Sequence, residues 1–372
     1  MTIGIIGLGA MGLGIAQVYA QAGHSVYATD ADPTARDTAK GRLTRSLDAR
    51  VAKGAMTATE RSAILDRLHV LDRIEDLSPV DLAIEAVVER LSVKQAVFAA
   101  LQPLLKPNAV LATNTSSLSV GAIATGLLRP ERLVGLHFFN PAPAMRLVEL
   151  IPHDTTAPDA LARARHLTEG AGKTVIQCAD RPGFIVNRCA RPYYGEALAL
   201  LSEGRTAAEI DAAITAAGYP IGPFGLIDLI GADINLAATE SLSLAMGNHP
   251  RYHVFSALQA QVASGNLGRK TGRGFVFPAP PAPAPADAKV IALRIEAALV
   301  NEAGWLLAEG GTTAEGIDTA LRLGLNFPRG PFQMLNAHGR DTVLAKLAAL
   351  ESNAPADLKG RYLPAPALSS GL

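Results

Sequence analysis

The segment LVGLHFFNPAPAMRLVELIP, residues 133–152, contains the side chains best suited to chemistry. One apolar run ends at His137, and a second apolar run carries Glu149. Pro141 and Pro143 between them favour a rigid, extended turn, so the two runs can bring the histidine and the carboxylate together. An imidazole titrates near neutral pH and can take up or release a hydroxyl proton, while a buried carboxylate on its other nitrogen fixes the tautomer. The pair therefore predicts proton transfer, although a single histidine at the end of a strand is more often structural.

A second cluster lies near the N-terminus, where the turn GLGAMG follows a short apolar run. Gly7, Gly9 and Gly12 have the G-x-G-x-x-G spacing, in which the first glycine permits a tight turn and the third lets the next helix pack closely. The second glycine lets backbone N–H groups approach a pyrophosphate, and the helix N-terminus that includes Ala10 and Met11 offers a partial positive charge. A strand before this turn and a helix after it favour a dinucleotide-binding site.

The acid at the end of the next apolar run favours one cofactor. Asp30 can accept hydrogen bonds from the 2′- and 3′-hydroxyls of an adenosine ribose and would repel a 2′-phosphate, so it favours NAD over NADP. The alternative, a helix N-cap, is better filled by Asp32, which directly precedes Pro33. A nicotinamide next to a proton-transferring histidine predicts a dehydrogenase.

Strands and helices alternate through the first half of the chain, as in a mostly parallel, doubly wound sheet. The expected strands are Thr2–Ile6, His24–Thr29, Leu82–Ala86, Val110–Thr113, Leu133–Phe138, Leu147–Ile151 and Thr174–Cys178. Two helical stretches, Pro33–Lys53 and Thr57–Leu68, interrupt the alternation and predict a helical hairpin arm with basic character. We therefore expect an α/β, Rossmann-type NAD-binding domain over residues 1–181.

Beyond Asp180 the pattern becomes helical, beginning with Phe184–Ser202 and Ala207–Ala217. A Pro/Ala-rich run at residues 278–287 predicts a semi-rigid linker between an all-α domain, residues 182–277, and a second one, residues 288–372. Two segments, which start at Glu196 and Glu302, contain the same short motifs in the same order, at an offset of about 106 to 108 residues. These motifs are an acid, then EG, T-A-E, I-D and G-P-F. Duplication of a helical domain explains this repeat, although little after Ala348 has a helical pattern.

Composition limits the remaining possibilities. The 372 residues contain 34 basic and 34 acidic side chains, which argues against nucleic acid as the main partner. Cys178 and Cys189 lack metal-ligand spacing and are expected to be buried thiols, so we expect no metal site. No signal-peptide pattern and no membrane-spanning apolar run are found in the sequence, and a cytoplasmic enzyme is the expectation.

Several motifs resemble those of the L-3-hydroxyacyl-CoA dehydrogenase family. They are HFFNP followed by the strand with Glu149, NTSSL (residues 114–118), DRPGFIVNR (residues 180–188), EAVVERLSVK (residues 85–94) and GRKTGRGFVF (residues 268–277). The likeness runs from residue 1 to about residue 277. It implies a reversible reaction in which L-3-hydroxyacyl-CoA and NAD give 3-oxoacyl-CoA and NADH, in fatty-acid or aromatic-acid degradation.

The resemblance also implies roles for single residues. His137 would be the catalytic acid/base, Glu149 its orienting partner, and Ser116 and Asn187 would hydrogen-bond the reacting oxygen and the imidazole. Further cofactor contacts are expected from Glu89, Lys94, Asn114, Asn140 and Lys270. On the helical arm, Ser46 and Lys53 match positions that contact coenzyme A, although an arm lysine could also be merely solvated.

The second helical copy has Leu293 near the position that Asn187 takes in the first, so we expect no second active site. The resemblance implies that single-copy members of the family form dimers through their helical domains. For this chain, with two copies, both a monomer and a homodimer are possible oligomeric states. Two rival hypotheses are a relative that acts on a free hydroxy acid or on carnitine, and a non-catalytic, crystallin-like NAD-binding protein. Phe138 and Phe139 favour the thioester, and the presence of both His137 and Glu149 favours an enzyme.

Overall fold

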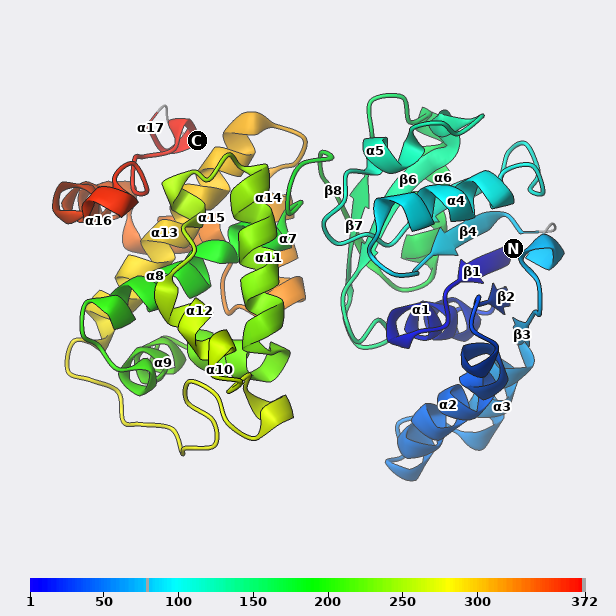
Figure 1. Cartoon of the computed structure of the whole chain (residues 1–372), viewed down its shortest axis with the longest axis horizontal. Coiled ribbons are helices and arrows are strands. Elements are labelled where there is room, and N and C mark those ends of the chain that lie inside the picture. The colour runs from blue at the N-terminus through cyan, green and yellow to red at the C-terminus, as the bar shows by residue number, and fades with distance from the viewer. Residues whose placement is uncertain (78–79, 370–372) are drawn as a thin grey trace. The chain divides into compact units, whose positions relative to one another are not determined.

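A computed structural model describes residues 1–77 and 80–369 of the chain (Figure 1). The last three residues of the expected second helical domain, 370–372, lie outside the described residues. Contacts divide the chain into two compact units, Met1–Arg181 and Pro182–Leu372, which are described separately below. None of the helices in the described residues is long and apolar enough to cross a membrane.

The first unit is built on an eight-stranded sheet with the order β3-β2-β1-β4-β5-β6-β7-β8. All neighbouring strands are parallel except β6 and β7. The strands are β1 (Thr2–Ile6), β2 (Ser25–Thr29), β3 (Leu68–Val70), β4 (Leu82–Glu85), β5 (Val110–Thr113), β6 (Leu133–Phe138), β7 (Leu147–Ile151) and β8 (Thr174–Gln177). The sequence pattern missed only β3, because its three residues directly follow a helix and are too short to show alternation.

Helices cover this sheet and extend one edge of it. They are α1 (Ala10–Gln21), α2 (Pro33–Ala52), α3 (Ala58–Asp66), α4 (Leu91–Leu101), α5 (Val120–Ala124) and α6 (Pro158–Gly170), with 3-10 turns η1 (Ile74–Leu77) and η2 (Pro130–Arg132). Figure 1 shows α2 and α3 as the expected hairpin arm, projecting from the rest of this unit. Asp32 caps α2 by accepting a hydrogen bond from Thr34 N, which leaves Asp30 for another role. The expected fold class is confirmed: a Rossmann-type domain followed by helices.

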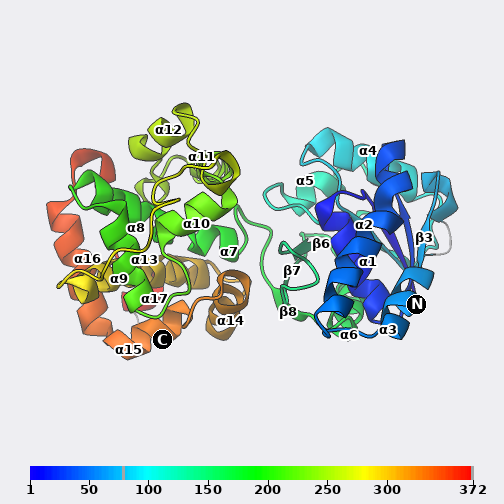
Figure 2. The ribbon, with the colours of Figure 1, turned by 90° about the horizontal axis from the view of Figure 1, so that it is seen from below.

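The second unit is helical throughout its described residues apart from short 3-10 turns and loops. Its helices are α7 (Val186–Cys189), α8 (Arg191–Ser202), α9 (Ala207–Ala216), α10 (Pro223–Ile230), α11 (Ala232–Ala245), α12 (Ser256–Ala263), α13 (Ala288–Glu309), α14 (Ala314–Leu325), α15 (Pro331–His338), α16 (Arg340–Asn353) and α17 (Pro366–Ser369), with η3 (Pro250–Tyr252), η4 (Arg269–Thr271) and η5 (Ala356–Leu358). The long α13 runs through the middle of the unit and packs on α8, α9, α15 and α16 (Figure 2). The expected single helix over Phe184–Ser202 is divided into α7 and α8, and Pro192 lies in the first turn of α8, where a proline is tolerated.

Equivalent motifs of the repeat have the same local structure. Asp211 accepts hydrogen bonds from Phe224 N and Gly225 N at the start of α10, and Asp318 accepts them from Phe332 N and Gln333 N at the start of α15. These aspartates explain why I-D and G-P-F recur together in the sequence: the acid of one helix caps the next. The expectation that little beyond Ala348 is helical is wrong, because α16 continues to Asn353 and η5 and α17 follow. The prolines and the glycine at positions 355, 360, 364 and 366 interrupt the apolar pattern and hid these short elements from the sequence analysis.

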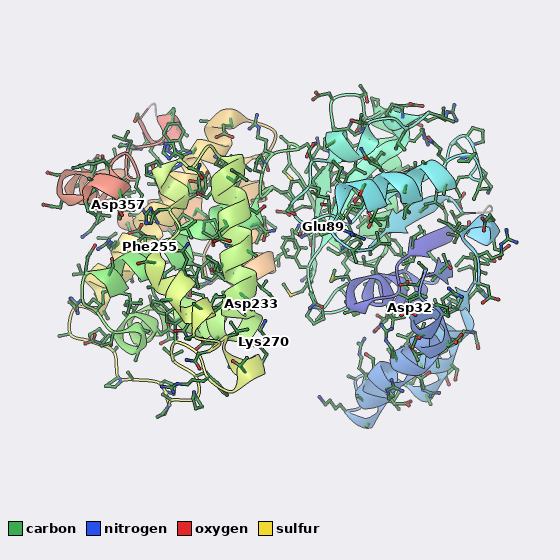
Figure 3. All side chains as sticks on the ribbon, viewed as in Figure 1. Asp32, Glu89, Asp233, Phe255, Lys270 and Asp357 are labelled. Carbon is green, nitrogen blue, oxygen red and sulfur yellow. The ribbon has the colours of Figure 1, made fainter. Side chains whose placement is uncertain are left out.

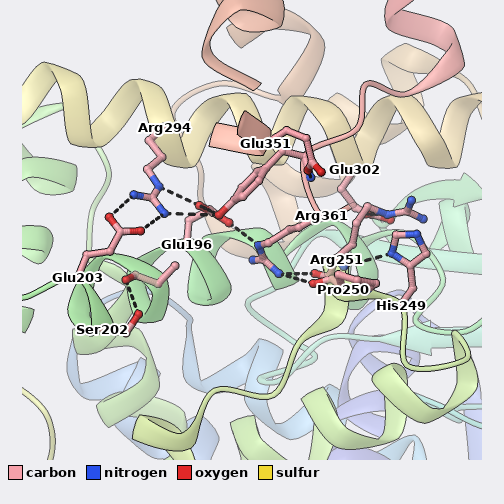
Figure 4. Close-up of polar contacts among 12 residues, drawn as sticks. Glu196, Ser202, Glu203, His249, Pro250, Arg251, Arg294, Glu302, Glu351 and Arg361 are labelled. Carbon is pink, nitrogen blue, oxygen red and sulfur yellow. Dashed lines mark hydrogen bonds and ion pairs between the residues drawn. The ribbon is translucent and has the colours of Figure 1, made fainter. Parts of the chain in front are cut away.

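Buried ion pairs join the two helical copies reciprocally. Glu196 of the first copy accepts hydrogen bonds from Arg294, Arg361 and Tyr362 of the second (Figure 4). Glu302, the counterpart of Glu196 in the repeat, accepts them from Arg188, Arg251 and Tyr252 of the first copy. The same residue types therefore occupy both halves of one charged network, which we call the reciprocal network.

Candidate active site

His137 and Glu149 lie opposite each other on the antiparallel strands β6 and β7. Side chains at directly opposite positions of such a pair point to the same face of the sheet. His137 Nδ1 is 2.6 Å from Glu149 Oε2, and the side chains are 8% and 0% exposed. Because the carboxylate is hydrogen-bonded to Nδ1, a proton exchanged with a ligand would go to or come from Nε2. The structure thus brings together the two residues on which the predicted chemistry depends.

The loop between β6 and β7 is held by a buried lysine. Lys173 Nζ donates hydrogen bonds to the carbonyl oxygens of Ala142 and Met145, at 2.6 and 2.8 Å. Burial lowers the pKa of Lys173, and these two carbonyls are its hydrogen-bond partners. The loop in turn packs on α1, because a Cβ placed on Gly14 would lie 3.3 Å from the side chain of Ala142. Sequence reasoning missed Lys173, whose only signal is one basic residue just before an apolar strand.

The glycine-rich turn has the geometry expected of a phosphate-binding turn. Gly7 has a φ of +100°, and a Cβ on Gly12 would lie 1.8 Å from the carbonyl oxygen of Gly7. Gly9 instead faces open space, with no atom within 4 Å of an added Cβ, and it begins α1 without a side-chain cap. Ala10 is exposed and Met11 is half-buried in the first turn of α1. Backbone N–H groups are therefore accessible where the pyrophosphate of NAD would bind, so the residues present fit this cofactor.

Asp30 connects this turn to the tip of β2. Its Oδ2 accepts a hydrogen bond from Leu8 N at 2.6 Å, and its Oδ1 accepts one from Asp32 N at 2.9 Å. The carboxylate is thus fixed next to the glycine-rich turn, where the ribose of a dinucleotide lies in Rossmann folds.

A chain of three charged residues, two of them buried, supports the loop after β5. Lys94 is 1% exposed and its Nζ lies 2.7 Å from Glu85 Oε1 and 3.1 Å from Glu89 Oε2. Glu89 accepts hydrogen bonds from Thr115 Oγ1 at 2.7 Å and from Ser116 N at 2.8 Å. Burial opposes the ionisation of Glu89, but Lys94 and these hydrogen bonds outweigh it and lower its pKa to about 2. Glu85, which also accepts from Thr113 Oγ1, was not among the expected site residues, although it ends the apolar run of β4.

Two asparagines flank the histidine. Asn114 Oδ1 accepts a hydrogen bond from Phe138 N at 2.8 Å and so joins the ends of β5 and β6. Asn140 is exposed in the loop after β6. Asn114 is thereby a link between strands in this structure, whereas Asn140 is accessible to a ligand.

A pocket of about 410 Å³ lies between the helical arm, the start of α1 and the loop after His137. It is lined by Ala10, Leu13, Gly14, Gln17, Arg42, Leu43, Ser46, Arg50, Pro141, Pro143 and Ala144. Of the two residues expected to contact coenzyme A, Ser46 lines this pocket, whereas Lys53 is exposed and is not part of the lining. Arg42 and Arg50 were not expected as ligand contacts, although their spacing of four residues on either side of Ser46 places all three on one helical face.

The remaining expected residues belong to the second unit. Asn187 lies half-buried in α7. Lys270 lies in η4, and its Nζ is hydrogen-bonded to both carboxylate oxygens of Asp233, at 2.5 and 2.7 Å; Figure 3 shows these two side chains next to each other. The segment after η4 is fixed by Asp228, which accepts hydrogen bonds from the backbone N–H groups of residues 275–277. Among the described residues of both units, no group of three His, Cys, Asp or Glu side chains could hold a metal ion.

Comparisons with known proteins agree with this geometry. The sequence profile of the 3-hydroxyacyl-CoA dehydrogenase NAD-binding domain matches residues 2–181. The profile of the family's C-terminal domain matches twice, at residues 183–277 and 291–370.

Individual relatives are similar over most of the chain. A 3-hydroxyadipyl-CoA dehydrogenase of Escherichia coli K12 is 45% identical over 73% of this chain, which spans 58% of that relative's length. A probable 3-hydroxybutyryl-CoA dehydrogenase of Deinococcus radiodurans is 38% identical over 74% of this chain and 99% of its own. A crystal structure of a 3-hydroxybutyryl-CoA dehydrogenase from Escherichia coli K12 superposes with a TM-score of 0.93 at 33% identity, covering 99% of this chain and 97% of its own.

Proposed function

The chain belongs to the 3-hydroxyacyl-CoA dehydrogenase family, and we propose that it oxidises an L-3-hydroxyacyl-CoA reversibly to the 3-oxoacyl-CoA through the His137–Glu149 pair. It is an NAD-dependent oxidoreductase. The observation that carries the proposed mechanism is the 2.6 Å contact between His137 Nδ1 and Glu149 Oε2, on two strands whose connecting loop packs against α1.

In the oxidative direction His137 takes the proton of the C3 hydroxyl on Nε2. Glu149 holds the ring in the tautomer that leaves Nε2 as the acceptor, and it stabilises the imidazolium that results. Because Glu149 is 0% exposed, water does not weaken this interaction. When bound, NAD supplies the acceptor for the hydride that leaves C3.

Ser116 and Asn187 are proposed to donate hydrogen bonds to the reacting oxygen. The backbone N–H of Ser116 donates a hydrogen bond to the Glu89 carboxylate, and Lys94 forms an ion pair with the same carboxylate. Since Lys94 is 1% exposed, we propose that it acts through Glu89 and is a positioning residue. Glu89 itself is partly exposed and is proposed to meet the ribose or nicotinamide, together with Asn140 and Lys270.

The coenzyme A moiety is proposed to bind in the pocket of the helical arm. Its volume of about 410 Å³ is in the range of small-molecule sites, and Arg42, Ser46 and Arg50 line one side. Arg50 is half-buried and offers a planar donor to a phosphate, so it replaces Lys53 as the proposed phosphate contact. The exposed Lys53 is instead proposed to contact only solvent.

The second helical copy, residues 288–372, is proposed to be a duplicate without an active site of its own. Leu293 takes the place of Asn187 in it, and a leucine cannot bind the reacting oxygen. The linker at residues 278–287 and the cytoplasmic location stay predictions, as does the choice between monomer and homodimer.

The test is to mix the protein with acetoacetyl-CoA and NADH and to follow the absorbance of the reduced nicotinamide. We expect oxidation of NADH with the thioester and little with free acetoacetate or dehydrocarnitine. Equal rates with a free acid would support the rival function on unesterified substrates. No oxidation with any of them would support a non-catalytic NAD-binding protein and would refute the proposal.

A further inference from the structure

Arg191 differs from the other buried arginines of the second unit. Four arginines in its described residues are buried, and three of them, Arg188, Arg294 and Arg361, form ion pairs with one or two glutamates. Arg191 is 8% exposed and has no carboxylate partner among the described residues. Its Nε donates to the carbonyl oxygen of Asn187 at 3.0 Å and its Nη1 to Thr239 Oγ1 at 3.1 Å, both of them neutral acceptors.

The electrostatic setting of Arg191 is correspondingly different. Burial acts to lower the pKa of all four guanidinium groups, but glutamates outweigh it for Arg188, Arg294 and Arg361 and raise their pKa. For Arg191 burial prevails and the pKa is lowered. The ring of Tyr194, 4.9 Å from the guanidinium carbon, is a weaker partner than a carboxylate. The site therefore holds a cation whose desolvation is offset by no anion among the residues that the structure describes.

A polar side chain whose amide atoms have no hydrogen-bond partner among the described residues lies on α11, the helix that carries Thr239. Asn235 is 1% exposed, and neither the oxygen nor the nitrogen of its carboxamide has a hydrogen-bond partner among the described residues. Asn235 lies one helical turn before Thr239 on α11, and Thr239 Oγ1 donates to the carbonyl oxygen of Asn235. The carboxamide is thus on the helix face that receives Arg191, and buried amides of this kind are rarely left unpaired.

The second helical copy shows what the fold itself requires at these positions. When the copies are aligned on Glu196 with Glu302 and on their G-P-F turns, Arg191 corresponds to Ala297. Asn235 and Thr239 correspond to Val343 and Leu347. All three counterparts are apolar and 0% exposed. Packing of the counterpart helices α13 and α16 therefore requires no polar side chains at these positions, and the polar trio of the first copy needs another explanation.

We propose that Arg191, Asn235 and Thr239 form a subsite for a carboxylate at the far end of the acyl chain, so that the substrates are thioesters of 3-hydroxydicarboxylic acids. This inference rests on the proposed function, because it uses Asn187 as a residue at the reacting oxygen. Arg191 at the start of α8 follows Asn187 of α7 by four residues, and its Nε reaches back across this short span to the carbonyl oxygen of Asn187. In an acyl group of about six carbons the terminal carboxylate lies only a few bonds beyond C3. A substrate whose C3 oxygen meets Asn187 could therefore place this carboxylate near Arg191.

The space at Arg191 is small, which limits what can bind there. A cavity of about 10 Å³ touches Arg191, Tyr194 and Thr239, and this is room for about one water-sized atom. A carboxylate oxygen fits such a space, whereas a branched or aromatic end does not. The Escherichia coli relative at 45% identity is named for such a substrate, since an adipyl chain ends in a carboxylate.

The experiment compares two substrates of equal length, 3-hydroxyadipyl-CoA and 3-hydroxyhexanoyl-CoA, by their kcat/KM with NAD. We expect the unmodified chain to prefer the adipyl thioester. Arg191→Met should lower the adipyl-to-hexanoyl ratio of kcat/KM about 10- to 100-fold, the range for a hydrogen-bonded charge. Asn235→Asp should lower the same ratio, because it would supply the missing anion inside the protein and repel the substrate's carboxylate. Arg322→Met, at an exposed position of the second copy, is the matched control and should leave the ratio unchanged.

Two results would overturn the subsite. One is an unmodified chain that oxidises both thioesters with equal kcat/KM. The other is a set of folded Arg191 and Asn235 variants whose ratio stays at that of the unmodified chain, even if both rates fall. Either of these leaves the proposed function standing, since the hexanoyl thioester is still oxidised. A chain that oxidises neither thioester overturns the proposed function and the subsite together.

Discussion

The reciprocal network allows the cost of one buried charge to be measured twice in the same chain. Glu302 accepts hydrogen bonds from Arg188 Nε at 2.7 Å, Arg251 Nε at 3.0 Å and Tyr252 at 2.5 Å. Arg188 is 0% exposed, so Glu302→Gln would leave a guanidinium in the interior with part of its countercharge removed. Breaking a buried ion pair from one side costs about 3–5 kcal/mol of unfolding free energy. We expect a loss in this range.

The same substitution at Glu196 tests whether the two halves of the network are equivalent. Glu196 accepts from Arg361 Nε at 2.7 Å, Arg294 Nε at 3.0 Å and Tyr362 at 3.1 Å, which is nearly the same geometry. For a unit of this size each kcal/mol shifts Tm by about 2–4 °C, so each variant should melt roughly 6–20 °C lower. Differential scanning calorimetry of the full chain measures this shift.

Glu203→Gln provides the control. Glu203 binds the same Arg294 from a side chain that is 52% exposed, so its loss should be much smaller. The reasoning would be refuted if Glu196→Gln and Glu302→Gln shifted Tm no more than Glu203→Gln. It would also be refuted if only one of the two had a large effect, because the network would then not be reciprocal in energy.

Four further predictions concern pH and the first unit. Burial alone would raise the pKa of Glu196, but its two arginines outweigh burial and the pKa is lowered. The ionised carboxylate therefore stabilises the fold fully above the ordinary glutamate pKa of about 4.3, and this stabilisation is lost as the pH falls below that value. The Tm of the unmodified chain should therefore fall more steeply below that pH than the Tm of Glu196→Gln; parallel curves would contradict this. His137→Gln should lower kcat about 100- to 10,000-fold, and Glu149→Gln nearly as far, while NADH binding, followed by fluorescence, persists; normal turnover of either variant removes that residue from the mechanism. Asp30→Asn should lower the ratio of kcat/KM with NAD to that with NADP about tenfold or more, and an unchanged ratio would show the specificity argument to be wrong. Arg50→Met should raise the KM for acetoacetyl-CoA about tenfold, whereas an equal effect of Lys53→Met would contradict the preference for Arg50.

Much of the first unit follows from local sequence. A strand with alternating or continuous apolar residues, a glycine at a positive φ and an aspartate before a proline each determine structure within a few residues, so β1, the turn at Gly7 and the cap at Asp32 could be predicted. The pairing of His137 with Glu149 could also be predicted, because a short loop between two strands fixes an antiparallel register.

Contacts between distant segments could not be predicted in this way. Lys173 lies far along the chain from the carbonyls of Ala142 and Met145, and no periodicity connects them. Lys94 looks like an accessible cation in sequence, but Glu85 and Glu89 draw it into the interior. Such side chains are placed by the whole fold, since a buried charge goes where a partner offsets its desolvation.

The two helical copies separate what the fold needs from what a ligand needs. Residue types that recur at equivalent positions, such as Glu196 and Glu302, bind across the copies and hold them together. Residue types that differ, such as Arg191 and Ala297, occupy equivalent positions of the repeat and are both buried, yet only one of them has a polar side chain. Folding alone tolerates the alanine, and a buried arginine without a carboxylate would destabilise the unit unless an anion came from outside. The lack of symmetry at this position is therefore the strongest physical argument that the first copy, and not the second, meets a charged substrate.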